Sequence, residues 1–365
     1  MIKFINKHKI LFILIIFFDV LVLTLSLIHI KYDVTCPASI DSIENVINIE
    51  NESSLDGSIN VVSVYSYEKV NLLSYLLANL NPYVEVSESV EYYDISYNDM
   101  YKGGTIQKRV SLYNAIIAGY KMAGYDLDYS FVGYIIHTKL TYADDFLEVG
   151  DIVTHVNGQK LSNEYSLSQA ITDNREQIVN GIDHSISMTI IKNYGTNSEK
   201  IVEQNIKTKE FDDEGKKSYG FGLSVYAYNI PITTANSPSF QILWSNVKSI
   251  GPSGGLLQSF YVYEKLTGAT LSSGLKIAGT GTVDIDGLAG PIGGIAQKII
   301  TAELSGVDIF FVPVSSPNYE SDDSETNYRD ALAAYNKLSN PHMKMVPVWS
   351  LAEIINYLTN YQNQE

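Results

Sequence analysis

The chain has 365 residues, a hydrophobic content of 45% and a formal net charge of −16, a composition typical of a folded protein too long for one ordinary domain. The acidic balance excludes nucleic acid as an expected partner, because it repels phosphate backbones. A single cysteine, Cys36, excludes an intramolecular disulfide and a cysteine-rich metal site, and the scattered histidines show no paired ligand spacing.

The N-terminal segment predicts a membrane anchor. Residues 10–30, ILFILIIFFDVLVLTLSLIHI, are apolar over the length that crosses about 30 Å of hydrocarbon as a helix. Lysines precede this run and the acidic body follows it, so the positive-inside rule places residues 1–9 in the cytoplasm and the rest outside. The run is longer than a signal-peptide core, and no Ala-x-Ala follows closely, which favours a retained anchor.

The next segments predict a tether and then mixed secondary structure. Residues 31–57 are polar with little periodicity, and we expect a tether there. Residues 58–125 predict a strand at SINVVSVYSY and helices at EKVNLLSYLLANL and IQKRVSLYNAIIAGYKMAGY. Residues 126–205 change to short alternating segments around an Asn157-Gly158 hairpin signal, so they predict a compact β-rich module.

This module resembles a PDZ domain in the sequence VGYII followed by FLEVGDIVTHVNGQKL. PDZ domains bind an extended peptide as an added strand, and a glycine-containing loop holds its terminal carboxylate. The resemblance places this loop at Phe131, Val132, Gly133 and Tyr134. Acidic residues in the adjacent TYADDFLE would lie close to a bound carboxylate, so a purely architectural module is the alternative.

The C-terminal part, residues 206–362, contains a serine in the glycine-rich turn SIGPSGGLLQSF. Ser253 precedes a predicted helix, GLLQSFYVYEKL, whose first N–H groups lack helical partners. Gly251 and Gly254 let a substrate carbonyl approach the backbone closely, and N–H groups from 251 to 254 are candidate oxyanion donors. The alternative for Ser253 is a helix N-cap.

Three arrangements compete to activate Ser253. An α/β-hydrolase elbow needs a downstream histidine, and only His342 follows. A phosphate-binding loop needs Gly-x-x-x-x-Gly-Lys-Ser/Thr, which is absent from the sequence, so we expect no ATP binding. The third uses Lys298, one turn into the helix predicted after GPIGG, where a desolvated lysine has a lowered pKa and can act as a base. An exposed helix lysine is the alternative.

The motifs GPSGG and GPIGGIAQK, with KIAGTGTVDIDG between them and GVDIFFVP behind, resemble the proteolytic domain of Lon-type serine proteases. The resemblance implies an α/β (α+β) fold with Ser253 as nucleophile, Lys298 as general base and Thr280 as a supporting hydrogen-bond partner. The family's alanine after the serine is Gly254 here. The resemblance also implies that residues 58–125 and 206–362 form one catalytic domain around the inserted module.

The whole chain resembles membrane-anchored PDZ–Lon-type bacterial proteases, which are ATP-independent. The resemblance implies a serine endopeptidase of the cell membrane, without a cofactor, that cleaves peptides or flexible protein segments on the extracytoplasmic side. It also allows a homo-oligomer, because Lon-type domains often form rings. The alternative is an inactive scaffold that binds peptides through the PDZ-like module, and the presence of both Ser253 and Lys298 argues against it.

Overall fold

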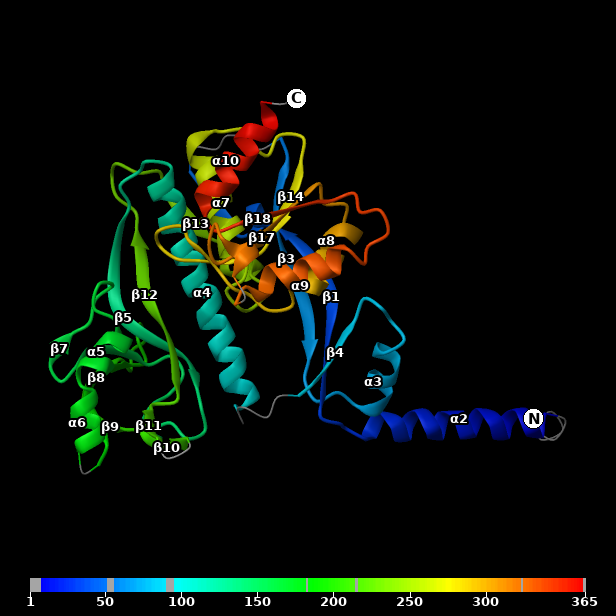
Figure 1. Cartoon of the computed structure of the whole chain (residues 1–365), viewed down its shortest axis with the longest axis horizontal. Coiled ribbons are helices and arrows are strands. Elements are labelled where there is room, and N and C mark those ends of the chain that lie inside the picture. The colour runs from blue at the N-terminus through cyan, green and yellow to red at the C-terminus, as the bar shows by residue number, and fades with distance from the viewer. Residues whose placement is uncertain are drawn as a thin grey trace.

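The computed structural model describes residues 8–50, 56–89, 95–181, 183–213, 216–322 and 324–363. The protein is a mixed α/β structure with two six-stranded sheets, and an N-terminal helix projects away from both (Figure 1). That helix, α2 (Lys9–Leu27), is wholly unburied. It is the one helix of the described ranges that is long and apolar enough to span a membrane.

The main sheet has the strand order β18-β17-β14-β3-β1-β4. Strands β3, β14, β17 and β18 run parallel, whereas β1 is antiparallel to both β3 and β4. The strand bounds are β1 (Tyr32–Ser42), β3 (Ser58–Tyr67), β4 (Glu85–Glu88), β14 (Lys276–Gly279), β17 (Ile309–Pro313) and β18 (Lys344–Val348). The strand predicted at SINVVSVYSY is confirmed with the predicted bounds.

Helices cover both faces of this sheet. Neighbouring residues on β17 point to opposite faces, so Phe310 packs into one apolar cluster and Phe311 into another. All of β17 is buried, as expected for a parallel strand covered on both sides. The Phe311 side holds α7 (Gly255–Thr267) and α10 (Leu351–Gln362), and the Phe310 side holds α8 (Ile295–Leu304) and α9 (Thr326–Tyr335).

The second sheet is antiparallel. In the sequence, its strands come between the two segments that build the main sheet. Its order is β12-β5-β6-β8-β9, with β7 paired to β6. It comprises β5 (Asp128–Lys139), β6 (Ile152–Val156), β7 (Gln159–Lys160), β8 (Ser185–Lys192), β9 (Lys200–Lys207) and β12 (Leu223–Ile232), with α5 (Leu167–Asp173), α6 (Arg175–Asn180) and the hairpin of β10 (Lys209–Asp213) and β11 (Lys216–Gly220). The predicted turn is confirmed, because Asn157 and Gly158 have φ of 47° and 75° between β6 and β7.

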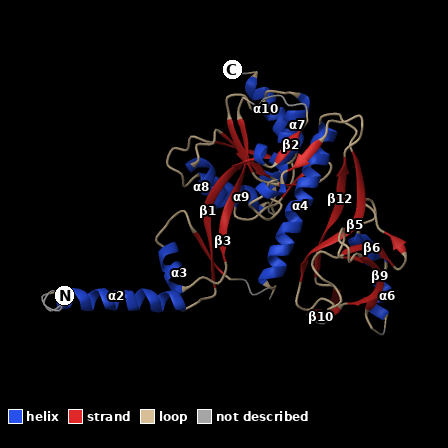
Figure 2. Ribbon diagram, turned by 180° about the vertical axis from the view of Figure 1, so that it is seen from behind, coloured by secondary structure: helices blue, strands red, loops and turns tan. Residues whose placement is uncertain are grey.

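The long helix α4 (Tyr97–Met122) joins the two sheets (Figures 1 and 2). One part of it packs on α7, and Ile106 and Val110 pack on Ile135, Ile152 and Tyr228 of the second sheet. Because apolar side chains fill this junction, the second sheet packs directly against α4 and is not connected to it by a linker alone.

Two sequence predictions about organisation are wrong. Residues 31–57 are not a tether, since β1 pairs with β3 and β4, and β2 (Ile47–Ile49) pairs with β13 (Phe240–Ile242). Ile43, Ile47 and Ile49 are buried in the main core; residues 51–55 lie outside the described ranges. The module boundary at residue 205 falls inside β9, and β12 belongs to the same sheet, so this unit extends to residue 232.

Candidate active site

Ser253 and Lys298 line one cleft of about 1210 Å³. Its walls come from β1 and β3, from the start of α4, and from the loops at 248–254 and 291–294. The titratable side chains of this lining are Asp41, Tyr65, Tyr97, Tyr101, Lys108, Tyr226, Lys248 and Lys298. This lining has three lysines but one carboxylate, Asp41, so the lysines of the cleft have few negative partners.

The turn before Ser253 is held on both sides by hydrogen bonds. Gly251 has a φ of 85°, which suits glycine, and its N–H donates to Gly104 O at 2.9 Å. The Ser111 hydroxyl of α4 donates to Pro252 O at 2.8 Å. The Ser253 carbonyl accepts two more hydrogen bonds, from the Thr280 hydroxyl and the Gly281 N–H, so the backbone of the turn is fixed before any substrate binds.

The residues just before α7 leave backbone N–H donors without partners among the described residues, at the cleft. Gly254 is the N-cap of α7 and no side chain caps the helix, so the N-cap alternative for Ser253 is wrong. In the described structure the N–H groups of Ser253 and Gly254 donate no hydrogen bond, whereas that of Gly255 donates to Pro252 O at 3.2 Å. Gly251, which the sequence suggests as a further donor, has its N–H engaged with Gly104.

Gly254 is required by space rather than by backbone conformation. Its φ is −97°, which any residue adopts. A Cβ at this position would lie 2.9 Å from Cγ1 of Val61 on β3. Glycine at this position therefore lets α7 and β3 approach closely beside the cleft.

Lys298 lies on α8, which starts at Gly294 in the left-handed conformation with φ of 66°. The side chain is 2% exposed, so the alternative of an exposed helix lysine is wrong. Its Nζ donates to Thr280 Oγ1 at 3.1 Å, and the Thr280 hydroxyl donates to Ser253 O at 2.9 Å. Gly281 N donates to the same carbonyl at 2.7 Å, so a short relay joins Lys298 to the backbone of Ser253.

The environment of Lys298 favours the neutral amine. Burial lowers its pKa from 10.5 to about 8, and the positive charge of Lys108 contributes in the same direction. No carboxylate of the described residues lies within salt-bridge distance of Nζ. The Ser253 hydroxyl makes no hydrogen bond within the described structure, so it is free to turn toward a base or a substrate.

Lys108 is the cleft residue that sequence reasoning missed. It lies on α4, is 6% exposed, and donates no hydrogen bond among the described residues. Burial lowers its pKa to about 8, and the charge of Asp41 on β1 opposes that shift. The polar sequence QKRVS gave no signal for it, because the burial of Lys108 depends on the packing of α4 against other elements.

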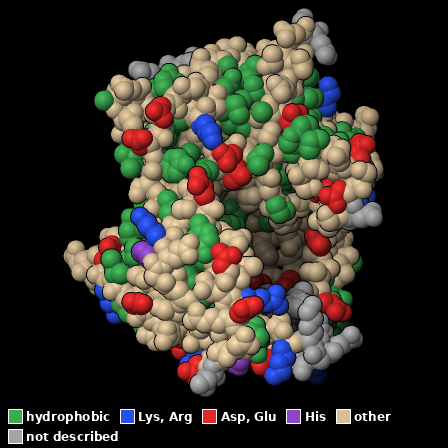
Figure 3. Space-filling view, turned by 60° about the vertical axis from the view of Figure 1, so that its left-hand side comes forward, with side chains coloured by type: hydrophobic (Ala, Val, Ile, Leu, Met, Phe, Trp, Pro, Cys, Tyr) green, Lys and Arg blue, Asp and Glu red, His purple; other side chains and the backbone are tan. Residues whose placement is uncertain are grey.

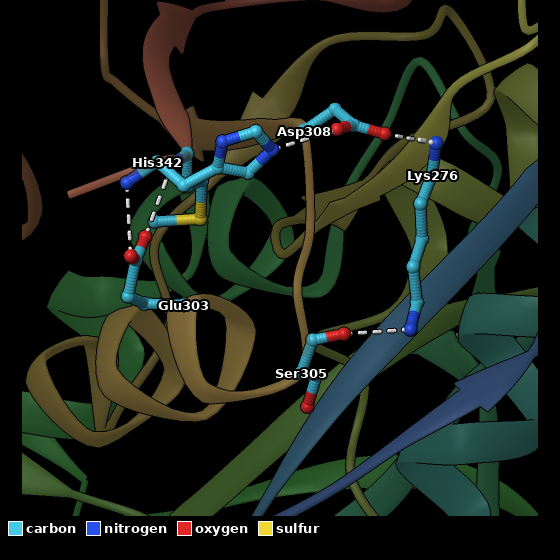
Figure 4. Close-up of polar contacts among 6 residues, drawn as sticks. Lys276, Glu303, Ser305, Asp308 and His342 are labelled. Carbon is cyan, nitrogen blue, oxygen red and sulfur yellow. Dashed lines mark hydrogen bonds and ion pairs between the residues drawn. The ribbon is translucent and has the colours of Figure 1, made fainter.

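His342 does not serve Ser253, because it lies at the opposite end of the main sheet. Its exposed ring places Nε2 3.1 Å from Asp308 Oδ1, and Asp308 Oδ2 accepts the Lys276 N–H at 2.7 Å (Figure 4). Lys276 starts β14, whereas Thr280 follows the end of that strand. Four strand residues span about 13 Å, which separates the histidine from the cleft.

The residues predicted to bind a peptide carboxylate lie in a strand, not in a loop. Phe131, Val132, Gly133 and Tyr134 all belong to β5, which pairs with β12 on one side and β6 on the other. A Cβ on Gly133 would lie 2.6 Å from the Ile152 side chain, so the close strand contact explains the glycine. The loop predicted at these four residues is therefore a strand.

The surface around these units carries charges of both signs. On the face drawn in Figure 3, acidic and basic side chains are interspersed, hydrophobic ones gather in the upper half, and a hollow opens near the centre. The described side chains of this face form no continuous basic patch.

In comparisons with known proteins, the chain matches no family model and no curated protein.

Proposed function

We propose that the chain is an ATP-independent serine endopeptidase in which Ser253 is the nucleophile and Lys298 its general base. The observation that carries the proposal is the burial of Lys298, with no described carboxylate within salt-bridge distance, in the same cleft as a serine at a helix start. A lysine with a pKa near 8 provides neutral amine at neutral pH, and proton abstraction by a positioned base is what a serine hydroxyl needs.

The proposed reaction is acyl transfer in two stages. Neutral Lys298 takes the Ser253 hydroxyl proton as Oγ attacks the peptide carbonyl carbon, and the N–H groups of Ser253 and Gly254 bind the resulting oxyanion. The carbon–nitrogen bond breaks, and Lys298 returns its proton to the leaving amine. Neutral Lys298 then takes a proton from a water molecule that attacks the serine ester. This step releases a carboxylic acid and restores the Ser253 hydroxyl.

Thr280 is the proposed positioning residue. It accepts from Lys298 Nζ and donates to Ser253 O, so it fixes the distance between the base and the backbone that bears the nucleophile. Proton transfer requires Oγ and Nζ to come within about 2.6–3.2 Å, a contact that tightens in many enzymes only when substrate is bound.

The proposed location is the outer face of a cell membrane. Helix α2 supplies an apolar span, and Lys3, Lys7 and Lys9 precede its core. Positive-inside bias then leaves everything after Leu27 outside the cytoplasm. There the enzyme has no need of ATP, and its substrates are extended peptides or flexible protein segments.

The test compares the full-length protein with its Ser253→Ala and Lys298→Arg forms in detergent, without ATP, on an unfolded protein and a peptide library. Both variants should lose cleavage by at least about 10²–10⁴-fold, because alanine has no hydroxyl to attack the substrate and arginine stays protonated. The control variants Ser249→Ala and Lys248→Arg alter the same cleft and should retain cleavage. Normal turnover in Lys298→Arg would overturn the dyad of Ser253 and Lys298. If no form cleaves and a serine-directed probe does not label Ser253, the peptide-binding scaffold is favoured.

A further inference from the structure

The junction between α2 and the main sheet is rigid. The Leu72 N–H donates to Ile28 O at 2.7 Å, and Ile30 N donates to Val70 O at 3.0 Å. His29 and Asn71 form an isolated β-bridge between these two bonds. Because the chain is hydrogen-bonded from its first residues beyond α2, the start of helix α3 (Leu72–Ala78) is fixed beside the end of the span.

Helix α3 and the turn after it expose apolar side chains at this place. Leu76, Leu77 and Leu80 are 46%, 58% and 80% exposed, and Tyr83 is 44% exposed. Leu80 has the largest exposed fraction of the large apolar side chains in the described ranges. Both ribbon views show α3 next to the inner end of α2 (Figures 1 and 2). A soluble surface does not favour this clustering.

The sequence around α3 is uncharged. Residues 70–84, VNLLSYLLANLNPYV, contain no acidic or basic side chain in a protein of net charge −16. A cavity of about 530 Å³ lies behind the helix, with Val34, Val70 and Leu77 among its lining residues and His29 at the anchor end. Charged side chains are therefore absent from α3 and the residues that flank it, whereas Glu68 and Lys69 are the charged residues that line the cavity.

We propose that α3 and the turn after it form a membrane-surface seat that binds the outer leaflet of a phospholipid bilayer. The inference rests on the proposed anchoring by α2. A seven-residue helix is only about 10 Å long, so all of α3 lies that close to the point where the chain leaves the span. Leu76, Leu77 and Leu80 enter the boundary of the acyl chains, and Tyr83 lies at headgroup level, where tyrosine is enriched.

The seat has a consequence for catalysis. With α2 fixed by hydrogen bonds and α3 held on the lipid, the main sheet keeps one orientation relative to the bilayer. The cleft then accepts chain segments that pass near the membrane surface in preference to those held far from it.

The experiment places a single environment-sensitive fluorophore on full-length protein in phosphatidylcholine nanodiscs, in a Cys36→Ser background. Labels are attached at Leu80→Cys, at Leu14→Cys in α2 as the reference expected inside the bilayer, and at Ile201→Cys on β9 as the control expected outside it. Ile201 is 68% exposed, and its strand, β9, lies far from α3 in both ribbon views. Lipids carrying a quencher near the headgroup should quench Leu80 at least about twofold more than Ile201, since interfacial helices lie roughly 5–10 Å deep.

The outcomes separate the two proposals. Quenching at Leu14 and Leu80 but not at Ile201 supports the seat. Quenching at Leu14 alone overturns the seat while the anchor stands. A Leu14 label that is not quenched overturns the anchor, and the seat with it. All three labelled positions are exposed side chains, so the substitutions leave the core unchanged.

Discussion

The two sheets each bury lysine, and they treat its charge in opposite ways. In the second sheet, Lys192 is 7% exposed, and its Nζ lies 3.0 Å from Asp151 Oδ2 and 2.6 Å from Phe146 O. At the main sheet, Lys298 and Lys108 are buried as deeply, but no carboxylate of the described residues lies within salt-bridge distance of either. These three lysines are buried to a similar extent, and they differ in whether a carboxylate lies beside them.

The difference supports the proposed chemical role of Lys298 and sets Lys108 beside it. A buried cation with a hydrogen-bonded carboxylate stays charged and holds neighbouring segments together. A buried cation without one lowers its own pKa and yields a neutral amine, the form that can take a proton. Unpaired charges are costly, and two of them in one cleft are typical of functional sites rather than of packing.

The largest effect on stability is expected at the paired lysine. Lys192→Met leaves Asp151 buried without its partner, so the free energy of unfolding should fall by about 3–5 kcal/mol. Urea denaturation followed by circular dichroism measures the change. The double variant Lys192→Met with Asp151→Leu should recover most of it, because both charges are then gone. An unchanged midpoint in Lys192→Met would show that the pair contributes nothing.

The opposite sign is expected for Lys298→Met. The folded pKa of about 8 lies below the unfolded value of 10.5, so the unfolded chain binds the proton more tightly. The penalty is fully present below pH 8 and disappears as the pH rises through 10.5. Methionine removes it, which should raise the free energy of unfolding at pH 7 by about 3 kcal/mol, since each unit of pKa is about 1.4 kcal/mol.

The comparison is made at two pH values. Unfolding of wild type and Lys298→Met is measured at pH 7 and near pH 10, where other groups titrate alike in both proteins. The gain should shrink at the higher pH. A variant less stable than wild type at pH 7 would mean that the lysine is paired in solution and the contrast between the two sheets fails.

The parts of this site that the sequence predicted are those set by local pattern. Apolar spacing gave the buried faces of the helices at 255–267 and 295–304, and their glycine-rich starts placed Ser253 and Lys298. Thr280 followed only from the resemblance, and its two hydrogen bonds supply the physical reason. Local pattern suffices where one segment determines both its own structure and the direction of its side chains.

The parts that failed depend on contacts distant in sequence. Segment 32–42 shows little alternation and buries only Val34 fully, so its strand conformation comes from pairing with β3 and β4 on both edges. Lys108 is buried because α4 has neighbours on more than one side. The stretch around Gly133 is similar to a binding loop in sequence, but in the fold it is part of strand β5 and pairs with β12.

The smallest effect expected is a shift of the pH profile in Lys108→Met. Activity should rise with pH as Lys298 loses its proton near pH 8. The charge of Lys108 lowers the pKa of Lys298, so its removal raises that pKa and moves the acidic limb of kcat/KM to higher pH. At pH 7 the variant is slower than wild type, and above the limb the two converge. Lys108→Arg keeps the positive charge and should not move the limb to higher pH. An equal loss at every pH, or the same shift in Lys108→Arg, would assign Lys108 to substrate contact or packing rather than to the electrostatics of the base.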